Sequence, residues 1–164
     1  GPVAADDKAV GFVAQALEVV EHRALGLEHE GRLAGHEEPL QACVAVGPLG
    51  DANHGDVVDA HLTALAEQEV LFARLLCEAS TLPLGARARI FALQSGIAWR
   101  LRAAYARDVA NGTARDMDPV VLANTWIALT NHYLMNRDLF APGASVIEVR
   151  GAELKKQLLE IIRP

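Results

Sequence analysis

Hydrophobic residues recur at steps of three and four along most of this chain, which is the period of an amphipathic helix. The first such stretch covers about residues 6–31, and a longer one covers about residues 56–79, with a break indicated near Gln68. No run of residues shows the sustained alternation of period two that marks a half-buried strand. The pattern therefore predicts an all-α fold.

Further segments complete this pattern. A short helical stretch is expected over 39–46, and residues 47–55, rich in Gly, Pro, Asn and Asp, are the clearest loop. Residues 86–111 predict a helix of about seven turns at 3.6 residues per turn. Ser145 and Glu148 have the spacing of a capping box at the start of the last helix. We expect one helical bundle of about six or seven helices.

The most informative stretch is the eighteen-residue segment 119–136, which contains no Asp, Glu, Lys or Arg. Asp118 is suited to cap a helix there, and Pro119 to its first position, where the missing N–H costs nothing. The segment is apolar around most of its circumference, so we expect none of its sides to face water. It is too short and too rich in Asn and Thr to span a membrane. The pattern favours burial against the protein core on one side and a second copy of the chain on the other.

Composition supports this interpretation. The chain has 164 residues, of which 51% are hydrophobic and 22% are charged, and its formal net charge is −6. We expect residues 1–5 to be a disordered leader, with Gly1-Pro2 typical of a protease-cleavage remnant, and residues 6–164 to form one domain. The excess of apolar side chains favours a dimer interface, an apolar cavity or both. An acidic chain is poorly suited to wrapping nucleic acid, which rewards clustered Lys and Arg.

The cysteines and the N-terminal residues indicate the cellular compartment of the protein. Cys43 and Cys77 both lie in apolar helical context, which favours buried free thiols over a disulfide. No basic segment precedes a short apolar core, so a secretory signal is not indicated. We expect a cytoplasmic protein that is not bound to a membrane.

From His61 to Pro164 the chain resembles the C-terminal regulatory domain of TetR/AcrR-family transcriptional repressors. The resemblance rests on LAEQEVLFARLLCEAS, on the turn NGTARDMDP, on the uncharged helix that follows it and on the tail RDLFAPGASVIEVRGAELKKQLLEII. Residues 6–46 fit the first helices of that domain more weakly. The resemblance implies a homodimer in which the last two long helices pack on their twofold mates as a four-helix bundle. It also implies a ligand pocket inside each protomer.

One departure from the family is large. Its members begin with a three-helix DNA-binding headpiece, and nothing in this chain corresponds to it. Either a longer protein was shortened to its sensor domain, or the natural protein has this fold alone. In both cases the chain is not expected to read DNA by itself, and DNA would be bound only through a headpiece outside it.

Polar residues within apolar helices indicate where a ligand would be oriented. Gln94 lies on the apolar stripe of its helix and is the best candidate for contact with a small, mostly apolar or amphipathic ligand. The expected pocket walls are Phe12, Phe72, Leu76 and Phe91, although each also fits a plain core.

The uncharged helix supplies the expected dimer contacts. Trp126 and Tyr133 are seven residues apart on one helical face, and aromatic residues are enriched at interfaces. Thr130, on the same helix, is assigned to the interface with them. Replacing Trp126 with Glu is expected to give monomers, because the change buries an unpaired charge.

No motif indicates catalysis. The pairs His22/His29 and His54/His61 lack the three or four converging ligands of a zinc site. Nucleophile-elbow and phosphate-loop motifs are absent. We therefore expect no catalytic residue, no metal and no cofactor, in a domain that senses a ligand by population shift.

Two alternatives stay open. The first is a stand-alone enzyme or binding protein that uses the same cavity, with His132, Asp56, Glu78 or His61 pointing inward and carrying perturbed pKa values. The second is a purely structural dimer with a filled core. A ligand that raises the melting temperature excludes the second alternative.

Overall fold

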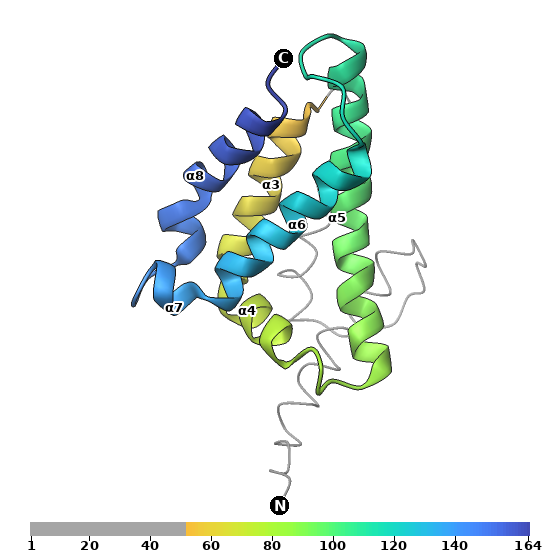
Figure 1. Cartoon of the computed structure of the whole chain (residues 1–164). Coiled ribbons are helices and arrows are strands. Elements are labelled where there is room, and N and C mark those ends of the chain that lie inside the picture. Colours follow the sequence, from red (N-terminus) through yellow and green to blue (C-terminus); the bar gives the residue numbers. More distant parts are fainter. Residues whose placement is uncertain (1–51) are drawn as a thin grey trace, which may run out of the picture.

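The computed structural model describes residues 52–164, and this part of the chain contains six α-helices and no strand (Figure 1). The predicted all-α fold is therefore confirmed for the described residues. None of these helices is both long and apolar enough to cross a bilayer. The helices are α3 (His54–Glu67), α4 (Glu69–Glu78), α5 (Leu84–Ala110), α6 (Pro119–Met135), α7 (Arg137–Phe140) and α8 (Val146–Ile161).

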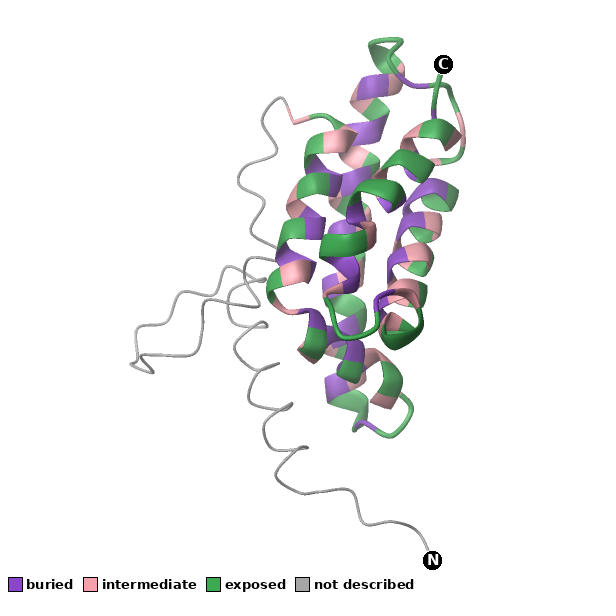
Figure 2. Cartoon of the chain, turned by 90° about the vertical axis from the view of Figure 1, so that its left-hand side faces the viewer, coloured by how far each residue is buried: buried purple, intermediate pink, exposed green. Residues whose placement is uncertain are grey.

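Two helices, α3 and α6, lie at the centre of the bundle. Helix α6 packs on α4, α5 and α8, and α3 packs on α5 and α8 (Figure 1). Buried residues follow the inner faces of the helices, and exposed residues follow the outer faces (Figure 2). The core is one large apolar cluster and a smaller one around Leu75 between α4 and α5. The largest fully buried side chains of the large cluster are Trp126, Tyr105, Leu65, Leu101, Leu122, Leu134, Leu154 and Leu158.

The helical region expected over 56–79 is two helices, and the break at Gln68 is confirmed. Helix α3 begins earlier than expected because Asn53 caps it. The side chain of Asn53 accepts the backbone N–H of Asp56 at 3.0 Å, and the Asp56 carboxylate accepts the backbone N–H of Asn53 at 2.9 Å. This reciprocal pair satisfies two N–H groups that the first turn leaves without helical partners.

The turn between α5 and α6 is held by specific contacts. Gly112, with φ of +73°, ends α5 in the left-handed conformation that favours glycine. The Tyr105 hydroxyl donates to the carbonyl of Arg115 at 2.5 Å and accepts the N–H of Met117 at 3.1 Å. Asp118 then accepts the N–H of Val120 at 2.7 Å and caps α6, as the sequence predicts.

Glu69 joins two helices that are far apart in the sequence. It is 4% exposed, and its carboxylate accepts the N–H groups of Val146 and Ile147 at 3.0 and 3.1 Å. The Ser145 hydroxyl donates to the same carboxylate at 2.5 Å, and Arg137 Nε lies 3.7 Å away. A negative charge is favoured at the N-terminus of a helix, where the macrodipole is positive. Glu69 therefore fixes the start of α4 to the start of α8.

Helix α6 has one side on the solvent in the single chain, and this is the side that a second copy is expected to cover. Val121 and Met135 are about half exposed, and Ala128 between them is exposed as well. The opposite side of α6 is buried, as expected. A second copy of the chain on the outer side stays a prediction.

Replacing Glu69 with Gln is expected to lower the free energy of unfolding by about 1–3 kcal/mol. The amide keeps one acceptor oxygen but turns an NH₂ donor toward N–H groups that need an acceptor. Urea denaturation followed by circular dichroism measures the effect. Glu67→Gln, at a neighbouring exposed position, should change stability by less than about 0.5 kcal/mol. Equal effects of the two substitutions would show that the Glu69 carboxylate does not hold α8.

Candidate functional site

A small, partly open cavity lies under the inner face of α6. Its volume is about 10 Å³, which is at the lower limit for one water molecule. Four helices meet there, because α3, α4, α5 and α6 each contribute side chains to the wall. The lining residues are His61, Leu65, Phe72, Leu93, Gln94, Ile97, Ile127, Thr130 and Asn131.

His61 is the buried polar side chain at the centre of this wall. It is 5% exposed, and the indole N–H of Trp126 donates to its Nδ1 at 2.9 Å. Because an indole nitrogen only donates, Nδ1 acts as an acceptor, and the neutral ring carries its proton on Nε2. Burial lowers the pKa of His61 from 6.5 to about 4. At neutral pH the ring is therefore uncharged and offers Nε2–H as a donor.

The other polar groups at the cavity are also uncharged. The Thr130 hydroxyl donates to the carbonyls of Trp126 and Ile127 at 3.0 and 3.1 Å, so its proton is already used within α6. The amides of Gln94 and Asn131 provide both donors and acceptors. No Asp, Glu, Lys or Arg is among the described residues that line the cavity. The site is thus suited to an uncharged polar group on an apolar skeleton, because a buried ion without a counter-ion is costly.

The structure brings together two of the five predicted ligand residues. Phe72 and Gln94 both line the cavity. Leu76 is half-buried and packs against the core and a smaller cluster around Leu75, so it does not reach the cavity. Phe91 is 66% exposed on the outer face of α5, and the expectation that it forms a wall with Phe72 is corrected. The fifth residue, Phe12, lies outside the described residues.

The predicted dimer residues need a similar correction. Trp126 is 0% exposed and Thr130 is 1% exposed, so neither has surface left for a second chain to cover. Tyr133 is half-buried and stacks on Phe140, with ring centroids 4.3 Å apart. The seven-residue spacing placed Trp126 and Tyr133 on one face, but that face points toward α3 and the core. Trp126→Glu would therefore disrupt the protomer itself and is no test of a dimer.

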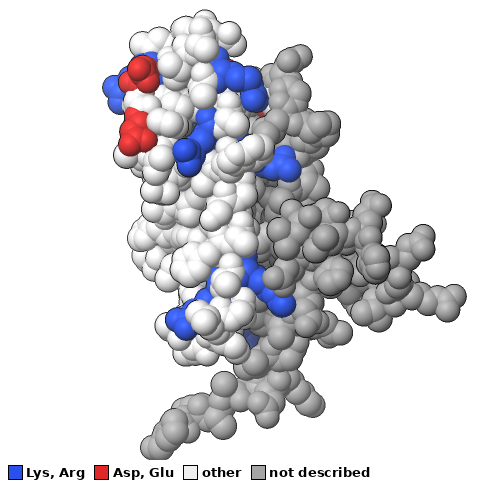
Figure 3. Space-filling view, turned by 90° about the vertical axis from the view of Figure 1, so that its right-hand side faces the viewer, with Lys and Arg blue, Asp and Glu red and all other residues white. Residues whose placement is uncertain are grey.

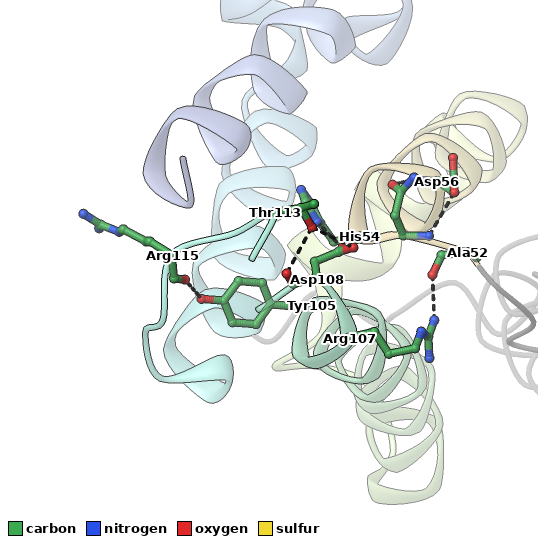
Figure 4. Close-up of polar contacts among 9 residues, drawn as sticks. Ala52, His54, Asp56, Tyr105, Arg107, Asp108, Thr113 and Arg115 are labelled. Carbon is green, nitrogen blue, oxygen red and sulfur yellow. Dashed lines mark hydrogen bonds and ion pairs between the residues drawn. The ribbon is translucent and has the colours of Figure 1, made fainter. Parts of the chain in front are cut away.

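A second polar cluster connects the start of α3 to the end of α5 (Figure 4). The Asp108 carboxylate accepts the backbone N–H of His54 at 2.8 Å and lies 2.5 Å from His54 Nδ1. The Thr113 hydroxyl donates to the backbone carbonyl of Asp108 at 3.0 Å, and Arg107 donates to the carbonyl of Ala52 at 2.6 Å. These bonds fix the entry of the chain into α3 against α5, which is a structural role.

Of the four groups considered for acid–base chemistry, only His61 reaches the cavity. Asp56 belongs to the capping box of α3, and Glu78 pairs with Arg74 on the surface at 2.9 Å. His132 is exposed on α6. One neutral histidine without an inward-pointing acid or nucleophile among these groups gives little support to a catalytic site.

Metal binding finds no support among the described residues. No three His, Cys, Asp or Glu side chains in residues 52–164 are grouped closely enough to hold an ion. The His22/His29 pair and Cys43 lie outside those residues. Cys77 is a free thiol as predicted, but it is exposed rather than buried.

Stability should depend on pH through His61. Between pH 6.5 and about 4 the unfolded chain binds a proton that the folded chain refuses, so stability falls as pH drops through this window. From pH 7 to pH 5 the expected loss through His61 is about 2 kcal/mol. Urea denaturation at both pH values should show this loss in the wild type and in His132→Gln. It should be absent in His61→Gln, which keeps an acceptor for Trp126. The same loss in all three proteins would contradict a buried, neutral His61.

Comparisons of the chain with protein-family models, with curated proteins and with solved structures each found no match. Neither a family nor an activity is therefore supplied by similarity. What the chain does has to be inferred from the cavity under α6 and from the surfaces of the helices around it.

Proposed function

We propose that this chain is a ligand-sensing and dimerising domain, similar in role to the regulatory domain of a TetR-type transcriptional regulator. The observation that carries the proposal is the position of α6. Its inner face lines the polar cavity through Ile127, Thr130 and Asn131, and its outer, charge-free face lies on the solvent. A ligand under α6 therefore acts on the same helix that a second subunit would cover. In the intact protein, a headpiece outside this chain would bind DNA.

The cavity supports a ligand that is mostly apolar and carries an uncharged polar group. His61 Nε2–H and the amides of Gln94 and Asn131 suit a carbonyl or hydroxyl oxygen, and the remaining wall is apolar. The present volume of about 10 Å³ is far below the several hundred Å³ of an ordinary small-molecule pocket. Binding therefore requires the walls to separate. The ligand would favour an open arrangement over the closed one described here, which is a population shift.

The outer face of α6 supports dimerisation. Val121, Ala128 and Met135 are spaced by seven residues and lie along one line of the helix. They are exposed, and α6 has no charged side chain to oppose a second copy of the same face. A twofold contact brings the same surface of each subunit together, so one apolar line serves both partners. These residues replace Trp126 and Thr130 as the proposed interface.

Ligand binding is tested with matched pairs of small molecules. A medium-chain methyl ketone should raise the melting temperature, whereas the carboxylate of equal length should not, because the wall offers it no counter-ion. Gln94→Leu should weaken the effect of the ketone roughly tenfold, which corresponds to the loss of one good hydrogen bond. Gln157→Leu, at an exposed position on α8, should leave the response unchanged. Stabilisation by the carboxylate alone would exclude this site.

Dimerisation is tested at Ala128. Ala128→Glu should convert dimers to monomers in sedimentation velocity, because two carboxylates would face each other across the twofold axis. The protomer should stay folded, since the position is exposed. Ala144→Glu, exposed in the loop before α8, is the control and should leave the dimer intact. If the wild type stays monomeric at high concentration, the proposed dimer is wrong, whatever the ketone does to the melting temperature.

A further inference from the structure

Charge is divided unevenly along this chain. Residues 1–51 carry nine Asp or Glu and three Lys or Arg, whereas residues 52–164 carry twelve of each kind. The formal net charge of −6 therefore comes from the first 51 residues alone. The described part of the chain is therefore neutral as a whole.

Helix α5 has the opposite bias to the N-terminal segment. Its only acidic residue is Asp108, which His54 already engages. On the side of the molecule where α5 lies, basic side chains gather at two levels with an uncharged band between them (Figure 3). The same division exists in the sequence of α5, which has no charge over residues 90–99. Its five basic residues are Arg87, Arg89, Arg100, Arg102 and Arg107.

The outer face of α5 is also apolar. Leu84, Phe91 and Trp99 are 75%, 66% and 60% exposed. Exposed Ala88, Ala92 and Ser95 lie between them at helical spacing, so the stripe is continuous along most of the helix. Among the described helices, α5 packs chiefly on α3 and α6, which contact its other side. Two large aromatic side chains on one exposed stripe mark a surface that gains from being covered.

Residues 6–31 match this surface in length, apolar pattern and charge. The stretch has 26 residues, and α5 has 27. It contains six Asp or Glu and two Lys or Arg, which is the complement of the arginines of α5. Its apolar residues recur at helical steps and form a stripe that could cover the one on α5; they are Val13, Leu17, Val20, Ala24 and Leu27.

The described part of the chain also begins close to α5. The described part begins at Ala52, whose carbonyl accepts a hydrogen bond from Arg107 near the end of α5 (Figure 4). The connecting residues 32–51 can span about 60 Å when extended, whereas α5 is about 40 Å long. The connection therefore allows residues 6–31 to reach any point along α5 in the same chain.

We propose that residues 6–31 dock as an acidic amphipathic helix on the outer face of α5 of the same chain. Their apolar stripe covers Phe91 and Trp99, and their carboxylates face the arginines at the two levels of α5. The docked helix gives the domain an additional layer on the side of α5 away from α3 and α6. This proposal does not depend on the ligand or on the dimer proposed for α6.

Hydrogen exchange on the full chain tests the docking. Amides in residues 6–31 should be protected in the wild type, and Trp99→Glu should speed their exchange at least roughly tenfold. Because Trp99 is exposed in the described part, the substitution should leave α3 and α6 protected. Val70→Glu is the control, since Val70 is 67% exposed and lies on α4 rather than on α5. Absent protection in the wild type, or equal effects of Trp99→Glu and Val70→Glu, would overturn the proposal.

A disulfide experiment identifies which chain supplies the helix. In a full chain with Cys43 and Cys77 changed to Ser, Leu17→Cys combined with Phe91→Cys should form a bond within one chain. Leu17→Cys combined with Val70→Cys should form none. A bond that joins two chains instead would assign the face to a second copy and overturn the proposal.

An external anion is the remaining occupant to test. If a DNA duplex or anionic vesicles changed the emission of Trp99, measured as wild type against Trp99→Phe, the face would serve that partner and the proposal would fail. Unchanged emission with both probes is expected, because the docked helix already covers the indole.

Discussion

The hydrogen bond between Trp126 and His61 is the contact on which the centre of this molecule depends. It joins α6 to α3 inside the core, where both side chains are buried. The bond also determines the protonation of the imidazole, because an indole N–H needs an acceptor. The ring is consequently neutral and carries its proton on Nε2. This one buried contact thus holds α3 against α6 and also sets the protonation of a side chain in the candidate site.

The surroundings of α6 explain why it has no charged side chain. It packs on α4, α5, α7 and α8, and it contributes Thr130 and Asn131 to a cavity where an ion would be costly. Its outer face, which also has no charged side chain, lies on the solvent. α5 differs, because it carries five arginines, while Leu93 and Ile97 face inward. The two neighbouring helices therefore differ in charge.

Local patterns in the sequence predicted the helices well, because caps and breaks are encoded by neighbouring residues. Asp118, Gln68 and Gly112 have the positions and roles that their residue types indicate. The candidate site was predicted only in part. Phe72 and Gln94 lie together, but which face of a uniformly apolar helix turns inward depends on helices distant in sequence. For that reason Trp126 was assigned to an interface, whereas it is part of the core.

Of the four groups that the sequence names as candidates to point inward, His61 is the one whose spacing places it in the core. It follows Val58 by three residues and precedes Leu65 by four, so it lies on the buried stripe of α3. A histidine at such a position needs a hydrogen-bond partner in the interior. The contact of Glu69 with α8 had no comparable local signal, because its partners are more than seventy residues away.

The hydrogen bonds of Glu69 with the start of α8 hold one end of α4 in place. Phe72 lies about 4.5 Å from Glu69 along the helix axis and Glu78 about 13.5 Å, at 1.5 Å per residue. Any outward displacement of Phe72 that leaves the anchor in place is therefore amplified about threefold at the far end of α4. Exposed Cys77 lies at that end, which makes its thiol the natural place for a spectroscopic label to register small changes inside the cavity.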